Sequence, residues 1–206
     1  MLNKYVYEDK TLDKALEKCY LELNVNANDI YYNEEIQKGS LLKASKVKIE
    51  VIKKEDIKIL IEQFIIEMCK YLNLNVNVDT TFTDENIKIK IDSDNNAVLI
   101  GKNGKMLNSI QTLLKKHLET VTNLNLKVYI DIENYKQRKI EILEKNVRKI
   151  AKEVKLTKVD AKLDEMNSYE RRIVHNIISE YDNLASESFG ETPHRYVVIK
   201  YVEGKE

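Results

Sequence analysis

The chain has 206 residues, of which 43% are hydrophobic and 33% are charged, so its composition allows a buried core and argues against disorder. Its 34 Lys and Arg residues balance its 34 Asp and Glu residues, which excludes a global positive field that would attract nucleic acid or anionic lipid. No apolar run approaches the length of a transmembrane helix, and the first ten residues lack the apolar core of a signal peptide. Cys19 and Cys69 form no CxxC motif, so we expect a cytoplasmic protein without a disulfide framework.

The first segment, residues 1–52, predicts a strand, a helix and two further strands. The strand is expected around residues 5–7, and apolar residues then recur at helical spacing over 12–23 behind Thr11 as a possible N-cap. Residues 29–35 and 46–51 read as strands, the second with clean alternation of apolar and polar positions. This β-α-β-β segment is near the lower size limit for independent folding.

The second segment, residues 55–132, has the predicted order α-β-β-α-α-β. An amphipathic helix over 57–72 precedes a hairpin formed by 75–82 and 85–92. A short helix or turn around two glycines follows, then a second amphipathic helix over 106–121 and a strand over 126–132.

The third segment, residues 133–206, begins with a long helix marked by apolar residues from 140 to 154. Between 136 and 158 the sequence has nine Lys and Arg residues against three acidic ones. A short strand near 161–163, a helix over 168–180, a turn over 186–195 and a strand over 196–202 complete the prediction. The fold class is therefore α+β, made of three small α/β units.

The tetrapeptide 101–104 holds two of the five glycines and lies between two predicted helices. Gly101 and Gly104 allow a tight reversal in which bare backbone approaches a phosphate, while Lys102 and Lys105 add charge and Asn103 adds a hydrogen-bonding amide. The helix that follows presents free N–H groups and the positive end of its dipole. On spacing alone, a GxxG is also compatible with a plain helix-to-helix turn. Three apolar residues are predicted to wall a groove for bases beside this loop: Ile100, Leu107 and Ile110.

A second candidate site is Arg171 and His175, whose spacing places both side chains on one face of a helix. Arginine offers a planar fork for phosphate, and a neutral histidine can stack on a base or donate one hydrogen bond. All five arginines follow residue 137, and two more of them, Arg172 and Arg195, are candidates for the same site. The alternative is a surface arginine beside a partly buried histidine with no ligand.

Three phrases carry a resemblance to a known family: LIGKNGKMLNSIQ, DIENYKQRK, and MNSYERRIVH with GETPHRYVVIK. The first resembles the loop region of a type II KH domain, whose GxxG loop clamps about four single-stranded nucleotides. The last resembles the Arg-x-x-x-His domain, called R-three-H here. Together they cover residues 55–202, and the chain resembles the bacterial Jag/KhpB family, also called EloR or SpoIIIJ-associated. Residues 1–52 resemble the Jag N-terminal domain more weakly, with residues 38–43 in place of its Gly/Phe-rich turn.

The resemblance implies a non-enzymatic protein that binds single-stranded RNA, or single-stranded DNA, through both modules. It also implies a small stand-alone KH protein and a YidC-type insertase as partners, and a setting in cell shape, cell-wall biogenesis or sporulation. The competing hypothesis is a protein-interaction adaptor that uses the KH fold to form a homodimer. No cofactor or metal is expected, because the sequence has no GxxxxGK[ST], no zinc-ligand spacing and no recognisable catalytic triad.

Overall fold

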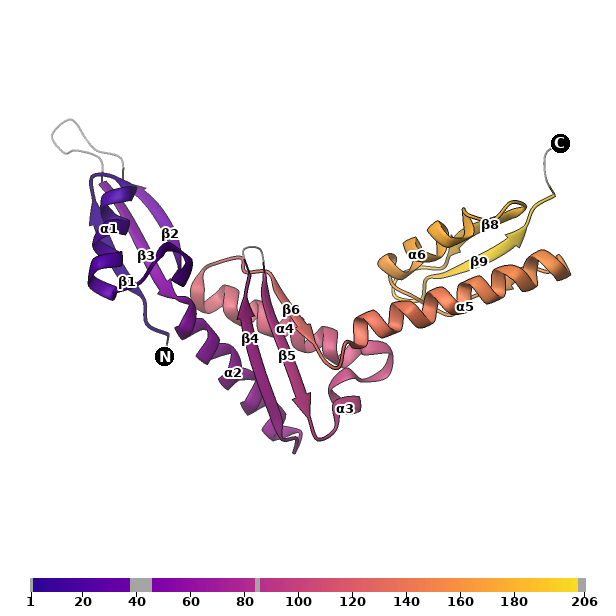
Figure 1. Cartoon of the computed structure of the whole chain (residues 1–206), viewed down its shortest axis with the longest axis horizontal. Helices are drawn as coiled ribbons and strands as arrows, with labels where there is room; N and C mark the ends of the chain where they lie inside the picture. Colours follow the sequence, from indigo (N-terminus) through magenta and orange to yellow (C-terminus); the bar gives the residue numbers. More distant parts are fainter. Residues whose placement is uncertain (1, 38–45, 84–85, 204–206) are drawn as a thin grey trace. The chain divides into compact units, whose positions relative to one another are not determined.

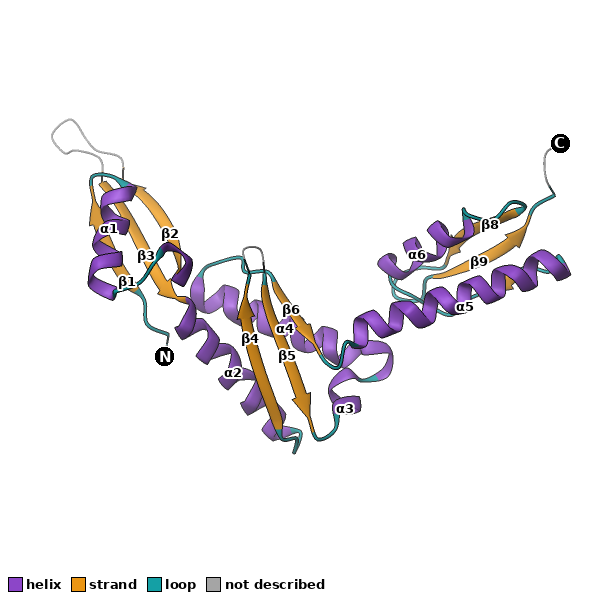
Figure 2. Ribbon diagram, viewed as in Figure 1, coloured by secondary structure: helices purple, strands orange, loops and turns teal. Residues whose placement is uncertain are grey.

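The computed structural model describes residues 2–37, 46–83 and 86–203, and it divides the chain into two compact units, residues 1–133 and 134–206. The described residues form three three-stranded sheets with helices, which confirms the predicted α+β class (Figure 1, Figure 2).

The amino-terminal module of the first unit is the predicted β-α-β-β arrangement. Its sheet has the order β1-β3-β2, with all strands antiparallel. The hydroxyl of Thr11 accepts a hydrogen bond from the Lys14 amide and so caps α1, which ends at the left-handed residue Asn24. The Gly/Phe-rich turn position, 38–43, lies outside the described residues. The elements are β1 (Tyr5–Asp9), α1 (Leu12–Leu23), η1 (Ala27–Asp29), β2 (Ile30–Gln37) and β3 (Lys46–Lys53).

No linker separates this module from the next, because α2 (Lys54–Tyr71) begins at the residue that follows β3. Its fully buried residues recur at intervals of four and form one face of the helix, as the apolar stripe predicts. These residues are Ile57, Ile61, Ile65 and Cys69.

The KH-like module continues with a sheet of order β4-β5-β6, in which β4 and β5 are antiparallel and β5 and β6 are parallel. Isoleucines 87, 89 and 91 of β5 are buried, and they alternate with exposed polar residues, so one face of the sheet packs against helices. The order αββααβ is the one predicted. Its elements after α2 are β4 (Val76–Phe82), β5 (Ile87–Ser93), α3 (Asn96–Ile100), η2 (Lys102–Gly104), α4 (Lys105–Thr122) and β6 (Val128–Asp131).

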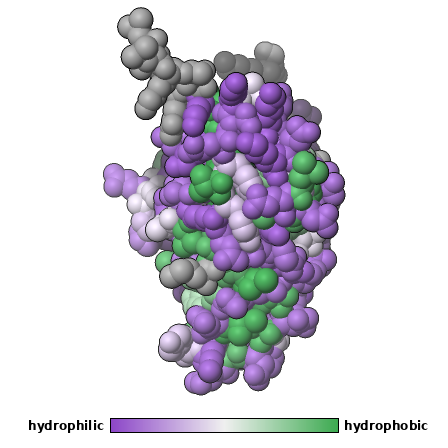
Figure 3. Space-filling view, turned by 90° about the vertical axis from the view of Figure 1, so that its left-hand side faces the viewer, coloured by the Kyte–Doolittle hydropathy of each residue, from purple (hydrophilic) through white to green (hydrophobic). Residues whose placement is uncertain are grey.

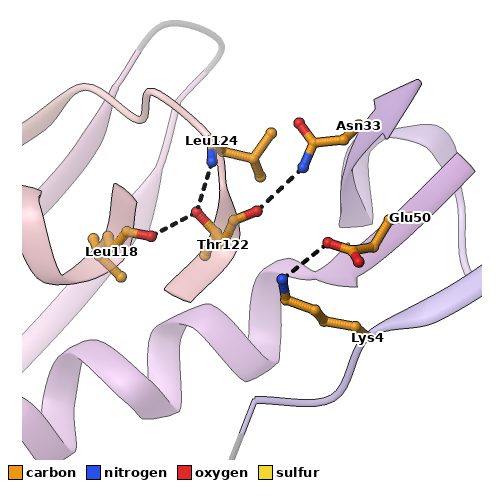
Figure 4. Close-up of polar contacts among 6 residues, drawn as sticks. All are labelled: Lys4, Asn33, Glu50, Leu118, Thr122 and Leu124. Carbon is orange, nitrogen blue, oxygen red and sulfur yellow. Dashed lines mark hydrogen bonds and ion pairs between the residues drawn. The ribbon is translucent and has the colours of Figure 1, made fainter. Parts of the chain in front are cut away.

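The amino-terminal module contacts the KH-like module at the carboxyl end of α4 (Figure 4). The Asn33 side-chain amide donates to the carbonyl oxygen of Thr122 over 3.1 Å. The buried Thr122 hydroxyl donates to the Leu118 carbonyl and accepts from the Leu124 amide, so this end of the helix is fixed. Because α4 has 18 residues, the contact lies roughly 25 Å from the glycine loop at its amino end, and that loop stays uncovered by it.

The second unit packs two helices against a sheet of order β7-β9-β8. Its core joins both helices to alternate residues of β9, with Val147, Ala151 and Val174 packed near Val197 and Ile199. The elements are α5 (Tyr135–Thr157), β7 (Ala161–Lys162), α6 (Ser168–Ile178), β8 (Leu184–Phe189) and β9 (Tyr196–Tyr201).

The prediction of a turn over 186–195 is wrong in its first four residues. Ser186 and Ser188 pair with Ile199 and Val197 of β9, and the chain reverses only after Phe189. Serine and glutamate have low strand propensity, but pairing with a buried apolar strand overrides it. The reversal uses Gly190 at φ +82°, where a Cβ atom would lie 2.6 Å from the carbonyl oxygen of His194.

Figure 3 shows one face of the molecule, on which hydrophilic side chains predominate and apolar side chains lie among them, more of them toward its lower half. No helix in residues 2–37, 46–83 or 86–203 has the length and apolar character needed to cross a membrane.

Candidate nucleic-acid interface

The glycine loop is a left-handed bend between α3 and α4. Gly101, Asn103 and Gly104 have φ values of +67°, +55° and +77°. The Gly101 amide closes α3 by donating to the Ala97 carbonyl over 2.9 Å, and the Gly104 amide donates to the Gly101 carbonyl over 3.2 Å. The bend is therefore held by its own backbone hydrogen bonds.

Gly101 cannot be exchanged without strain. Its angles, φ +67° and ψ 178°, lie in a region that essentially only glycine occupies. A Cβ atom built there would lie 2.7 Å from the Cβ of Met106. Glycine at this position is thus required by the backbone itself, whatever the loop binds.

The loop presents cations to solvent. Lys102, Asn103 and Lys105 are exposed, while Gly104 is buried. No side chain among the described residues caps the amino end of α4, and its first turn contains no acidic residue. The positive end of the helix dipole therefore combines with two lysines into a site suited to an anion.

The predicted apolar groove needs correction. Leu107 and Ile110 are only 0% and 1% exposed, so they belong to the core beneath the loop and do not line an open groove. Both lie on the inner face of α4 together with Leu114 and Leu118, which the helical period dictates. Of the three predicted residues only Ile100, which is half-buried, reaches the surface.

In the second unit, α6 and β8 bring the predicted Arg–His pair together with two serines. The Nδ1 atom of His175 lies 2.7 Å from the Ser186 hydroxyl, and its Nε2 atom lies 2.9 Å from the Ser188 hydroxyl. Arg171 donates from Nη1 to the same Ser188 hydroxyl over 3.3 Å. Both ring nitrogens of His175 are therefore occupied within the protein, and Ser188 links the histidine to the arginine.

The two serines were missed because the segment around them was predicted to be a turn. Their spacing of two residues would place both hydroxyls on one face of a strand, which is the only signal the sequence carries. The other predicted arginines stand apart from this cluster. Arg172 is exposed and Arg195 is half-buried, and neither shares a hydrogen bond with the cluster in the described part of the chain. The Nε atoms of Arg171 and Arg195 are buried and have no hydrogen-bond partner there.

Burial, and to a smaller extent the neighbouring Arg171 charge, lower the pKa of His175 below its usual value of 6.5. The folded-state pKa then lies below the unfolded one, so the unfolded chain binds the proton more readily as the pH falls through 6.5. We expect acidification from about pH 7.5 to about pH 5.5 to lower the stability of the second unit. Thermal unfolding at both values should show a smaller fall for His175→Gln, and an equal fall in both proteins would contradict the assignment.

The helix that carries this pair starts at a capping box. The Asn167 side chain accepts from the Glu170 amide and the Glu170 carboxylate accepts from the Asn167 amide, each over 2.9 Å. Lys139 of α5 approaches the other oxygen of Glu170 to 2.6 Å. Glu170 is 5% exposed, so one carboxylate caps α6 and ties it to α5.

Replacing Glu170 with alanine should destabilise the second unit by about 2 kcal/mol, because the change removes a cap and leaves Lys139 without this partner. Glu170→Gln should cost less, since the amide oxygen can still accept the capping bond. Urea unfolding followed by hydrogen exchange of α6 measures both values. The exposed Glu191→Ala is the control, and a similar loss there would show that the capping box is not the cause.

The described residues contain no group of three or more His, Cys, Asp and Glu side chains arranged to hold a metal ion. What they hold is an uncapped cationic bend on an αββααβ unit, and an Arg–His pair on a helix facing a three-stranded sheet. This arrangement is that of a KH domain followed by an R-three-H domain, which defines a class of modular nucleic-acid-binding proteins.

Comparison with known proteins gives the family. Residues 58–132 match the family model "KhpA/KhpB, KH domain", and residues 141–201 match that of the R-three-H domain. The chain is 30% identical over 196 residues to the "RNA-binding protein KhpB" of Clostridium symbiosum, covering 92% of this chain and 88% of the relative. The chain belongs to the KhpB family, also called Jag or EloR, as the resemblance predicted.

Other relatives of the same name match over shorter stretches. The protein of Streptococcus pneumoniae serotype 2 strain D39 is 31% identical over 146 residues, which are 68% of this chain and 44% of that protein. The protein of Bacillus subtilis strain 168 is 34% identical over 117 residues, 56% of each chain. The match thus spans about half the length of these two relatives.

Proposed function

We propose that this chain is a non-enzymatic, cytoplasmic protein that binds single-stranded RNA. The observation that carries the proposal is the bend at Gly101–Gly104, where the exposed Lys102 and Lys105 flank the amino end of α4. The choice of RNA over DNA is supported by the name of the relatives, "RNA-binding protein KhpB". The proposed modules are residues 1–52, 55–132 and 133–206.

In the KH module, the amino end of α4 and the side chains of Lys102 and Lys105 bind backbone phosphates, and the two glycines let the strand approach closely. Ile100 provides apolar surface next to the loop. Because the net charge of the chain is zero, we expect the protein to neutralise few phosphates of the bound strand. Its affinity for RNA should therefore be modest, with a shallow salt dependence.

In the R-three-H module, Arg171 binds phosphate through its guanidinium, and His175 positions the edge of β8 through Ser186 and Ser188. Arg172 and Arg195 add positive charge to the same module. Because one chain carries both modules, the second binding event is intramolecular, and the pair outbinds either module alone.

Removing the Arg–His pair should weaken binding of a single-stranded oligoribonucleotide by about tenfold, the loss of one charged phosphate contact. Fluorescence anisotropy of the full chain with Arg171→Ala plus His175→Ala measures this. Arg148→Ala is the matched control, because Arg148 pairs with Glu180 on the exposed surface of the same unit. If the double variant binds RNA with wild-type affinity, the Arg–His pair does not contact RNA and the R-three-H module has only a structural role.

A second candidate function is a protein-interaction adaptor that forms a homodimer through the KH module. The balanced charge favours it, as does the amino-terminal module, which is fixed to the KH module through Asn33 and Thr122. Crosslinking in cells followed by nuclease treatment separates the two functions, because an adaptor protects no RNA. The resemblance implies two partners, a stand-alone KH protein and a YidC-type insertase, and a setting in cell elongation, envelope synthesis or sporulation. The same crosslinking experiment would test for these partners.

A further inference from the structure

Within the described residues of the second unit, one face of the sheet has no helix packed against it. Val197 and Ile199 of β9 enter the core with α5 and α6, so the alternate residues Tyr196, Val198 and Lys200 lie on the opposite face. On β8, Ser186 and Ser188 pair with the core residues of β9, which places Phe189 beside Tyr196 on the open face.

Four side chains form a continuous row across the three strands of this face. The Lys162 ammonium lies 4.1 Å from the centre of the Tyr196 ring. That ring stacks on Phe189 with 6.1 Å between centroids and 26° between planes. The Lys200 ammonium lies 5.0 Å from the Phe189 ring. We call this row the aromatic strip: Lys162, Tyr196, Phe189 and Lys200.

The charge on the strip favours an anionic, aromatic ligand. Lys162 is exposed and makes no ion pair within residues 2–37, 46–83 and 86–203, while Lys200 pairs with Glu187, the one acid among its neighbours on β8. Two stacked rings flanked by ammonium groups suit a polymer that alternates flat bases with phosphates. A lysine over a half-buried ring such as Phe189 or Tyr196 is held more weakly than a base stacked on it, so the lysines can exchange ring contacts for phosphate contacts.

We propose that the aromatic strip is a second contact surface for the single strand bound by the Arg–His pair, with an unpaired base stacked on Phe189 and Tyr196. The inference rests on the proposed function and extends it to the other face of the sheet. The two surfaces are adjacent, since Phe189 directly follows Ser188, which holds both Arg171 and His175. Because β8 is an edge strand, a nucleic-acid strand can pass around it, with phosphate contacts on one face and base contacts on the other.

The chain contains no tryptophan, so Phe189→Trp creates a single reporter in the strip. Saturating the full-length variant with a single-stranded oligoribonucleotide of about twelve nucleotides should quench its emission, because the base stacks on the indole ring. An abasic strand with the same number of phosphates should bind more weakly and leave the emission unchanged. Tyr71→Trp, at a position 90% exposed on α2, is the matched control and should stay unquenched.

Affinity measurements supply an independent readout. Phe189→Val plus Tyr196→Val keeps strand-forming residues and should weaken RNA binding at least about fivefold with little change in salt dependence. Lys162→Ala plus Lys200→Ala should instead lower the salt slope by about 1.4, the value for two phosphate contacts on a single strand.

Two results together would overturn the strip as a nucleic-acid surface: unquenched tryptophan emission of Phe189→Trp at saturation, and wild-type RNA affinity of Phe189→Val plus Tyr196→Val. The strip would then be a candidate surface for a protein partner. The proposed function would survive that result if exchanging both Lys102 and Asn103 for aspartate still weakened RNA binding. A wild-type chain that binds no single-stranded RNA would remove both proposals together.

Discussion

Exchanging Lys102 and Asn103 for aspartate should weaken single-stranded RNA binding by about 100-fold at moderate salt. The double variant changes the loop charge by three units, and each unit close to a phosphate in high dielectric is worth about 1 kcal/mol. Fluorescence anisotropy over a range of salt concentrations measures the loss, which should shrink as salt screens the repulsion.

This variant should remain folded, so its loss can be assigned to the loop. Asn103 has left-handed angles, which aspartate tolerates, and two carboxylates at the amino end of α4 interact favourably with the helix dipole. Lys70→Asp plus Asn73→Asp is the matched control: it has the same residue types, the same charge change and a left-handed asparagine, at the end of α2. Equal losses in the two variants would mean that overall charge, and not the loop, determines affinity.

Gly101→Ala should destabilise the first unit by about 3 kcal/mol. Alanine in this backbone region costs about 1–3 kcal/mol, and its Cβ atom would overlap the Cβ of Met106, only 2.7 Å away, which adds a packing cost of similar size. Hydrogen exchange of α3 and α4 under native conditions measures the change in free energy.

Asn103→Gly is the control for that variant, because glycine adopts the same left-handed angles without strain, so it should destabilise the unit much less than Gly101→Ala does. A Gly101→Ala protein as stable as the wild type would show that the bend relaxes. The expected instability also means that lost RNA binding in a glycine variant would not identify a contact. The charge variant is therefore the sharper test of the loop.

The order of elements and the position of the glycine loop could be read from the sequence. Apolar spacing determined α2, α4 and α5, alternation determined β3 and β5, and the glycine pair identified the bend between α3 and α4. These features are local: each follows from the preferences of a few adjacent residues, and the same-face placement of Arg171 and His175 follows from helix period alone.

Contacts between distant residues decided the rest. The sequence predicted a turn where β8 forms, because the stability of that strand comes from pairing with β9, and the same pairing brings Ser186 and Ser188 to His175. It predicted a groove at Leu107 and Ile110, where the tertiary structure buries both.

The α+β units, the cationic bend and the spacing of the Arg–His pair are thus encoded locally, since periodicity and glycine placement act over a few residues. The burial of individual side chains, the hydroxyls that hold His175 and the contact of Phe189 with Tyr196 on an open sheet face emerge only from the folded chain. Burial and cross-strand pairing depend on which segments meet in space, and no local pattern encodes that meeting.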